Sequence, residues 1–117
     1  MNLKQFYDIF GDYDDALRRF GNAERLTKFL RRFQTDSSYE RLKTALGDNN
    51  YPEAFLAVHT LKRIALNLGL VELADFSSKM TELLRHQSDY NPEVDELFPL
   101  LSAEYERVFA AISATFD

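Results

Sequence analysis

Apolar residues recur along most of this chain at intervals of three or four positions, which is the spacing of one face of an α-helix. Residues 22–33 predict one helix, capped by Asn22, with the apolar stripe Leu26, Phe29, Leu30 and Phe33. Residues 36–47 predict a second, with the stripe Tyr39, Leu42, Ala45 and Leu46. Either Asp36 or the capping-box spacing from Ser37 to Glu40 starts this second helix, and Gly47 stops it.

Three further helices follow. The third begins near Pro52, which suits a first helical turn, and ends at Gly69. The fourth covers residues 71–87 and follows almost at once, so these two helices should be antiparallel neighbours. The fifth opens at Asn91 and carries the stripe Leu97, Leu101, Tyr105, Val108 and Ile112. Pro99 lies inside this pattern and either kinks the helix or displaces its start.

The N-terminal residues 3–20 predict one or two short helices, broken near Gly11, and no segment alternates as a strand does. We therefore expect an all-α fold, an antiparallel four-helix bundle of up-down-up-down order with a short N-terminal helical extension. Neither a linker nor a repeat divides the sequence, so residues 1–117 are expected to form a single domain.

Composition narrows the classes of function. A net charge of −5 disfavours nucleic-acid binding, and no apolar stretch approaches the roughly 20 residues of a membrane span. The N-terminus lacks the apolar run of a signal peptide, so we expect a soluble cytoplasmic protein whose partners are proteins. There is no cysteine, no glycine-rich phosphate loop and no histidine pair at metal-ligand spacing. Neither a cofactor nor a metal is therefore expected.

Of the two histidines, His59 lies in the middle of the third helix. Seven apolar residues of that helix fall within an arc about 120° wide: Ala54, Ala57, Val58, Leu61, Ile64, Ala65 and Leu68. His59 lies about 160° from the centre of this arc and should face outward. Lys62 and Arg63 follow one turn later. Two cations beside a histidine favour its neutral form, which leaves a ring nitrogen free as a nucleophile, and they attract an incoming phosphoryl group. The other histidine, His86, is interpreted as a solvated residue near a helix C-terminus.

Three apolar residues, Phe55, Leu56 and Leu66, lie on the same outward side. Exposed apolar clusters commonly mark interaction sites, so these residues are a candidate docking patch. The alternative is that the N-terminal helices cover them as a second layer of core.

The string His59-Thr60-Leu61-Lys62, followed by Ala65, Asn67, Leu68 and Gly69 and then by Leu73 and Ala74, resembles the signature helix of histidine-phosphotransfer (HPt) domains. The resemblance covers roughly residues 22 to 90 and includes a glycine ten residues after the histidine. It implies that His59 is the phosphoacceptor and that Lys62 neutralises the phosphoryl oxygens. It also implies that Gly69 ends the helix and lets the next one pack closely.

The resemblance supplies two supporting candidates on the following helix. Thr81 stands where some family members have a glutamine that orients the histidine, and Arg85 where some have a basic residue near the phosphoryl group. One departure is Arg63, since the family has glycine after the lysine, which leaves space for a receiver domain. The long side chain of Arg63 either obstructs the receiver or adds a cation for phosphate.

The resemblance therefore implies a phosphorelay carrier rather than a self-contained enzyme. His59 would accept a phosphoryl group from a receiver-domain aspartate and pass it to another receiver. The expected partners are response-regulator receiver domains and a hybrid sensor kinase, and the expected state is a monomer. Two alternatives stay open: a degenerate HPt-like bundle that binds receivers or kinases without carrying phosphate, and an unrelated helical adaptor in which His59 is incidental.

Overall fold

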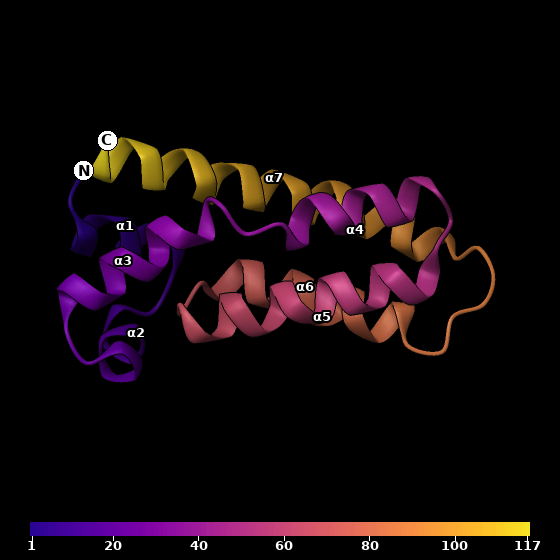
Figure 1. The fold of residues 1–117 in the computed structure, drawn as a ribbon, viewed down its shortest axis with the longest axis horizontal. Coiled ribbons are helices and arrows are strands. Elements are labelled where there is room, and N and C mark those ends of the chain that lie inside the picture. The colour runs from indigo at the N-terminus through magenta and orange to yellow at the C-terminus, as the bar shows by residue number, and fades with distance from the viewer.

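The computed structural model describes all 117 residues, and its regular elements are all helices (Figure 1). They are α1 (Leu3–Phe10), α2 (Tyr13–Phe20), α3 (Ala23–Phe33), α4 (Ser38–Gly47), α5 (Tyr51–Asn67), α6 (Val71–Leu84) and α7 (Pro92–Phe116). The only β-type pairing is one isolated bridge between Gly11 and Leu70. The predicted all-α class is confirmed. None of the helices combines the length and the apolar character that crossing a bilayer requires.

Local capping chemistry sets the start of the early helices. The side chain of Asn22 accepts a hydrogen bond from the Arg25 N–H and caps α3, as predicted. For α4, the Asp36 carboxylate accepts from the Ser38 N–H at 2.9 Å, whereas Ser37 makes no side-chain cap bond. Of the two predicted starts of α4, the Asp36 interaction is therefore the one that forms.

The helices α4 and α5 are each followed by a residue with a left-handed backbone. Gly47 is the last residue of α4, as expected, but Asn49 makes the reversal, with φ of 53°. At the end of α5 the reversal falls on Gly69, with φ of 67°, and the Leu70 N–H donates to the Ala65 carbonyl at 2.9 Å. A positive φ costs glycine little because it has no Cβ, so Gly69 ends α5 as predicted.

One prediction about the last helices is corrected, and one of the two alternatives for Pro99 is excluded. The fourth helix was expected to run to residue 87, but α6 ends at Leu84 because Arg85 is extended and His86 has a left-handed backbone with φ of 61°. Pro99 does not displace the start of α7, which begins at Pro92 behind the Asn91 cap and continues to Phe116 with Pro99 inside it. Proline has no backbone N–H, so Pro99, which is exposed, removes one donor from the helical hydrogen bonds.

The long helix α7 extends along nearly the whole molecule, with α3 and α4 end to end beside it and the paired α5 and α6 beneath (Figure 1). Tyr39 of α4 donates to the Ser102 hydroxyl and stacks on the Tyr105 ring. The Gln34 amide, just after α3, donates to the Phe109 carbonyl further along α7. The largest fully buried side chains come from six of the seven helices and from the turn before α6: Phe6, Tyr7, Leu26, Leu30, Leu42, Leu61, Leu70, Leu73, Met80, Leu84, Leu101 and Ile112.

The N-terminal helices close the turn between α5 and α6. The buried Tyr7 hydroxyl donates to the Leu68 carbonyl at 2.7 Å, and the Asp12 N–H donates to the Gly69 carbonyl at 2.9 Å. Burial raises the pKa of Tyr7, so its phenol stays protonated and keeps this bond. A Cβ on Gly11 would overlap the Gly69 carbonyl. The expected close packing at Gly69 therefore involves the segment that leads into α2.

Candidate functional site

His59 lies on α5 with its ring partly exposed, while the apolar residues of the opposite arc, Ala54, Ala57, Val58, Leu61, Ala65 and Leu68, are buried. The Nδ1 atom is enclosed and has no hydrogen-bond partner. The Nε2 atom is not enclosed in this way, and His59 is partly exposed, so Nε2 is the ring nitrogen that solvent can reach. A ring nitrogen with a lone pair in this position can act as a nucleophile toward a group arriving from outside.

An aromatic side chain one turn earlier lies against the His59 ring. The rings of Phe55 and His59 are stacked, with centroids 5.8 Å apart and planes 6° apart. The Arg85 guanidinium carbon lies 5.3 Å from the centroid of the Phe55 ring. Arg85 donates through Nη2 and Nε to the two carboxylate oxygens of Glu82, at 3.0 and 3.3 Å. Arg85 therefore contacts Phe55, which in turn stacks on His59.

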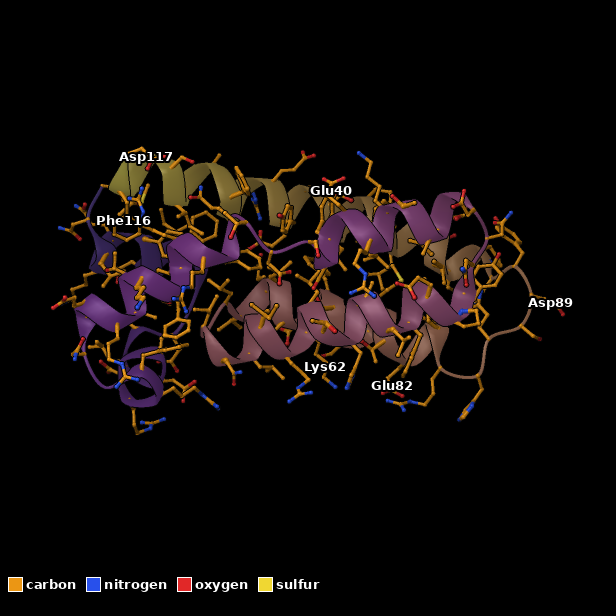
Figure 2. The ribbon with its side chains drawn as sticks, viewed as in Figure 1. Glu40, Lys62, Glu82, Asp89, Phe116 and Asp117 are labelled. Carbon is orange, nitrogen blue, oxygen red and sulfur yellow. The ribbon has the colours of Figure 1, made fainter.

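Two cations beside His59 have no carboxylate partner. Lys62 is half-buried and Arg63 is exposed, and neither forms an ion pair or a hydrogen bond through its side chain. The pKa of Glu82 is lowered mainly by its hydrogen bond from Arg85, then by the charge of Arg85, with a smaller contribution from Lys62. The side chains of Lys62 and Glu82 both point away from α4 and α7 (Figure 2). The surface beside His59 therefore carries two cations, Lys62 and Arg63, that no ion pair neutralises.

Apolar side chains flank this surface. Leu56 is 54% exposed and Leu66 is 45% exposed, while Phe55 is half-buried. The N-terminal helices do not cover the two leucines, so the second-layer alternative is wrong for them. A groove of about 430 Å³ opens beside Phe55, between the start of α5 and the residues that follow α6. It is lined by Pro52, Phe55, Leu56, Leu84, Arg85, His86 and Gln87.

On α6, Thr81 is level with His59, because Phe55 meets Arg85 and the two helices run in opposite directions. The Thr81 side chain is fully buried, and its hydroxyl donates to the Ser77 carbonyl at 2.7 Å. It makes no hydrogen bond to His59. The structure therefore brings Thr81 to the predicted level of α6 without the polar contact that a glutamine there would supply.

Two features of the site were missed from the sequence. Glu82, which holds Arg85, was not singled out, although its spacing of three residues from Arg85 is a common helical ion-pair spacing. The stack of Phe55 on His59 was also missed, although a spacing of four residues places two rings on one helical face. No group of three or more His, Asp or Glu side chains in the structure could hold a metal ion.

Comparison with known proteins identifies the family. The family model for the Hpt domain matches residues 24–111, which is well over half of the chain and spans α3 to α6 and most of α7. No curated protein and no solved structure shows a significant match. The matched region contains the outward-facing His59 with Lys62 beside it, and Gly69 at the end of the same helix. The chain therefore belongs to the Hpt-domain family, whose members take part in phosphotransfer in two-component systems.

Proposed function

We propose that this protein is a phosphorelay carrier in which His59 accepts a phosphoryl group from the aspartyl phosphate of one receiver domain and passes it to another. The single observation that carries the proposal is the state of the His59 ring. Its Nε2 atom faces solvent beside the unpaired Lys62, while its Nδ1 atom is turned inward. The proposed partners are response-regulator receivers and a hybrid sensor kinase, in the cytoplasm.

The fold proposed for the carrier is one domain over residues 1–117. Within it, α3 to α7 are proposed to form an antiparallel four-helix bundle, with α3 and α4 end to end, and α1 and α2 are proposed to be the short N-terminal extension. Support comes from the successive contacts of α4 with α5, α5 with α6 and α6 with α7. The bundle holds His59 on a regular helix rather than on a loop, which suits a nucleophile whose orientation must stay fixed.

The proposed reaction transfers a phosphoryl group from a carboxylate oxygen of the receiver aspartate to a ring nitrogen of His59. The Nε2 lone pair of a neutral imidazole attacks phosphorus, and the N–P bond forms as the P–O bond to the receiver aspartate breaks. The bonding electrons leave with the carboxylate, and the ring proton stays on Nδ1. Delivery to the next receiver reverses these steps and restores neutral His59. Lys62 and Arg63 are proposed to balance the charge of the phosphoryl oxygens during both transfers.

Docking is proposed to involve the exposed leucines on either side of the nucleophile. Leu56 precedes His59 by nearly one turn and Leu66 follows it by two. Apolar side chains at both ends of a charged centre suit a partner that buries an apolar surface around its phosphorylated aspartate. This arrangement favours a receiver domain over a small phosphodonor.

A transfer experiment tests the proposal. Receiver domains of the host are charged with radiolabelled acetyl phosphate and mixed with the wild-type protein, His59→Gln or His86→Gln. The expected result is acid-labile label on the wild-type and His86→Gln proteins and none on His59→Gln. If no receiver labels the wild type, the carrier function is wrong. Receiver binding that persists without label would instead support the bundle that binds without carrying phosphate.

A further inference from the structure

No hydrogen bond to another group of the protein fixes the orientation of the His59 ring. A functional histidine is commonly oriented by a hydrogen bond to the ring nitrogen that does not react. Here Nδ1 is enclosed and has no partner. Thr81, which is level with His59 on α6, donates its hydroxyl to the Ser77 carbonyl. No polar group therefore holds the plane of the ring.

An apolar contact takes the place of that hydrogen bond. The Phe55 ring lies nearly parallel to the His59 ring, with 6° between the planes and 5.8 Å between the centroids. Such offset stacking is a preferred arrangement of flat rings. Rotation of the His59 ring out of this plane would lose the contact, so the stack limits rotation about the Cβ–Cγ bond.

The Phe55 ring is itself held from the neighbouring helix. The Arg85 guanidinium lies over it at 5.3 Å, a distance at which a cation is attracted to an aromatic face. Glu82 fixes that guanidinium with two hydrogen bonds, at 3.0 and 3.3 Å. Phe55 is also half-buried, unlike the freely exposed Leu56 beside it. A series of contacts thus extends from Glu82 on α6 to the nucleophile on α5.

We propose that Phe55 is a positioning residue for phosphotransfer, which keeps the plane of the His59 imidazole fixed so that the Nε2 lone pair is aimed outward at the phosphoryl group. This inference rests on the proposed function and assigns Phe55 a different task from docking. The lone pair lies in the plane of the ring, so a ring that rotates freely spends less time aligned for attack. Arg85 acts in turn through Phe55, rather than through the phosphoryl group.

The test compares Phe55→Leu, which keeps apolar bulk but removes the flat ring, with Phe55→Tyr, which keeps the ring. Leu56→Ala is the control for docking. Transfer from a charged receiver is measured over a range of receiver concentrations, and the ring protons of His59 are followed by NMR. Phe55→Leu is expected to lower the maximal transfer rate about fivefold with little change in receiver affinity. Phe55→Tyr should keep the wild-type rate, and Leu56→Ala should weaken affinity alone.

The NMR readout needs no phosphoryl transfer. Ring-current shifts of the His59 protons should be present in the wild type and Phe55→Tyr and absent in Phe55→Leu. An active wild type with an unchanged maximal rate in Phe55→Leu overturns the positioning role while leaving the carrier function intact. A loss of affinity alone in Phe55→Leu also overturns it, because Phe55 would then be a docking residue. An inactive wild type overturns the carrier function, and the shifts then report only whether the stack exists.

Discussion

One stretch of α5 and the turn that follows this helix have different surroundings. Around residues 68–70 the turn is closed by the N-terminal helices, since the Tyr7 hydroxyl donates to the Leu68 carbonyl and the Asp12 N–H donates to the Gly69 carbonyl. Around residues 55–63 the same helix stays open. There Lys62 and Arg63 lack ion-pair partners, and Nδ1 of His59 lacks a hydrogen bond.

The groups at the covered turn stabilise the fold through their hydrogen bonds. The side chains around His59 have no such partners and can interact with an incoming group. A buried polar group without a partner costs free energy, so folded proteins rarely leave one without a reason. At the covered turn the backbone carbonyls are satisfied by distant residues. At the open stretch the unsatisfied nitrogen is Nδ1 of His59, the residue that is the nucleophile in the proposed chemistry.

Substitution at the covered turn should have the largest effect on stability. In Gly69→Ala the new Cβ would lie 2.9 Å from the Asp12 carbonyl oxygen, on a backbone with φ of 67°. We expect the free energy of unfolding to fall by about 2 kcal/mol in chemical denaturation. Gly47→Ala is the matched control, because nothing lies within 4 Å of its added Cβ. An equal effect at both glycines would refute the packing argument.

Lys62→Ala should have the larger effect on transfer at the open stretch. Removal of a charge-assisted contact to the phosphoryl oxygens is expected to slow transfer from a charged receiver about tenfold. The free energy of unfolding should change little, because Lys62 forms no ion pair. Lys43→Ala, an exposed lysine on α4, is the control and should transfer at the wild-type rate. A wild-type rate in Lys62→Ala would remove Lys62 from the site.

Arg63→Ala tests whether this side chain obstructs the receiver or assists transfer. Because no ion pair holds Arg63 over His59, we expect it to swing toward an arriving phosphoryl group, and its loss to slow transfer about threefold. Alanine is used in place of the family glycine so that helix propensity is preserved. A faster transfer in the variant would show that Arg63 obstructs the partner.

The smallest effect concerns the ion pair that holds Arg85. The Arg85 hydrogen bond lowers the pKa of Glu82, so Arg85→Gln should raise the pKa of that carboxyl toward its ordinary value. The stabilising contribution of the pair is present above the ordinary pKa and is lost as the pH falls through the lowered one. NMR titration of the carboxyl carbon measures the change. Arg19→Gln, which should shift only its own partner Asp15, is the control, and a Glu82 pKa that stays lowered in Arg85→Gln would contradict the assignment.

Regular features of the helices were predictable, because each depends on neighbours in sequence. The Asn22 cap, the reversal at Gly69 and the outward position of His59 all follow from helical geometry and local hydrogen bonding. The end of α6 was not predictable in this way, since His86 adopts a left-handed backbone, which is uncommon for any residue other than glycine.

Contacts between helices were the less predictable part of the site. The exposure of Leu56 and Leu66 was not predictable, because an outward apolar residue has the same sequence pattern in a second core layer as in a docking surface. The link from Glu82 through Arg85 to Phe55 depends on how α5 and α6 pack, which the pattern of one helix does not contain. Thr81 was predicted at the correct level, yet its burial and its bond to Ser77 were visible only in three dimensions.

The most direct test of the account is to locate the phosphoryl group on the protein after transfer from a charged receiver, by phosphorus–proton correlation NMR. The account predicts a single phosphoramidate on Nε2 of His59, correlated with both carbon-bound ring protons of that residue. A phosphoramidate on His86, on Nδ1 of His59, or on neither histidine would contradict it.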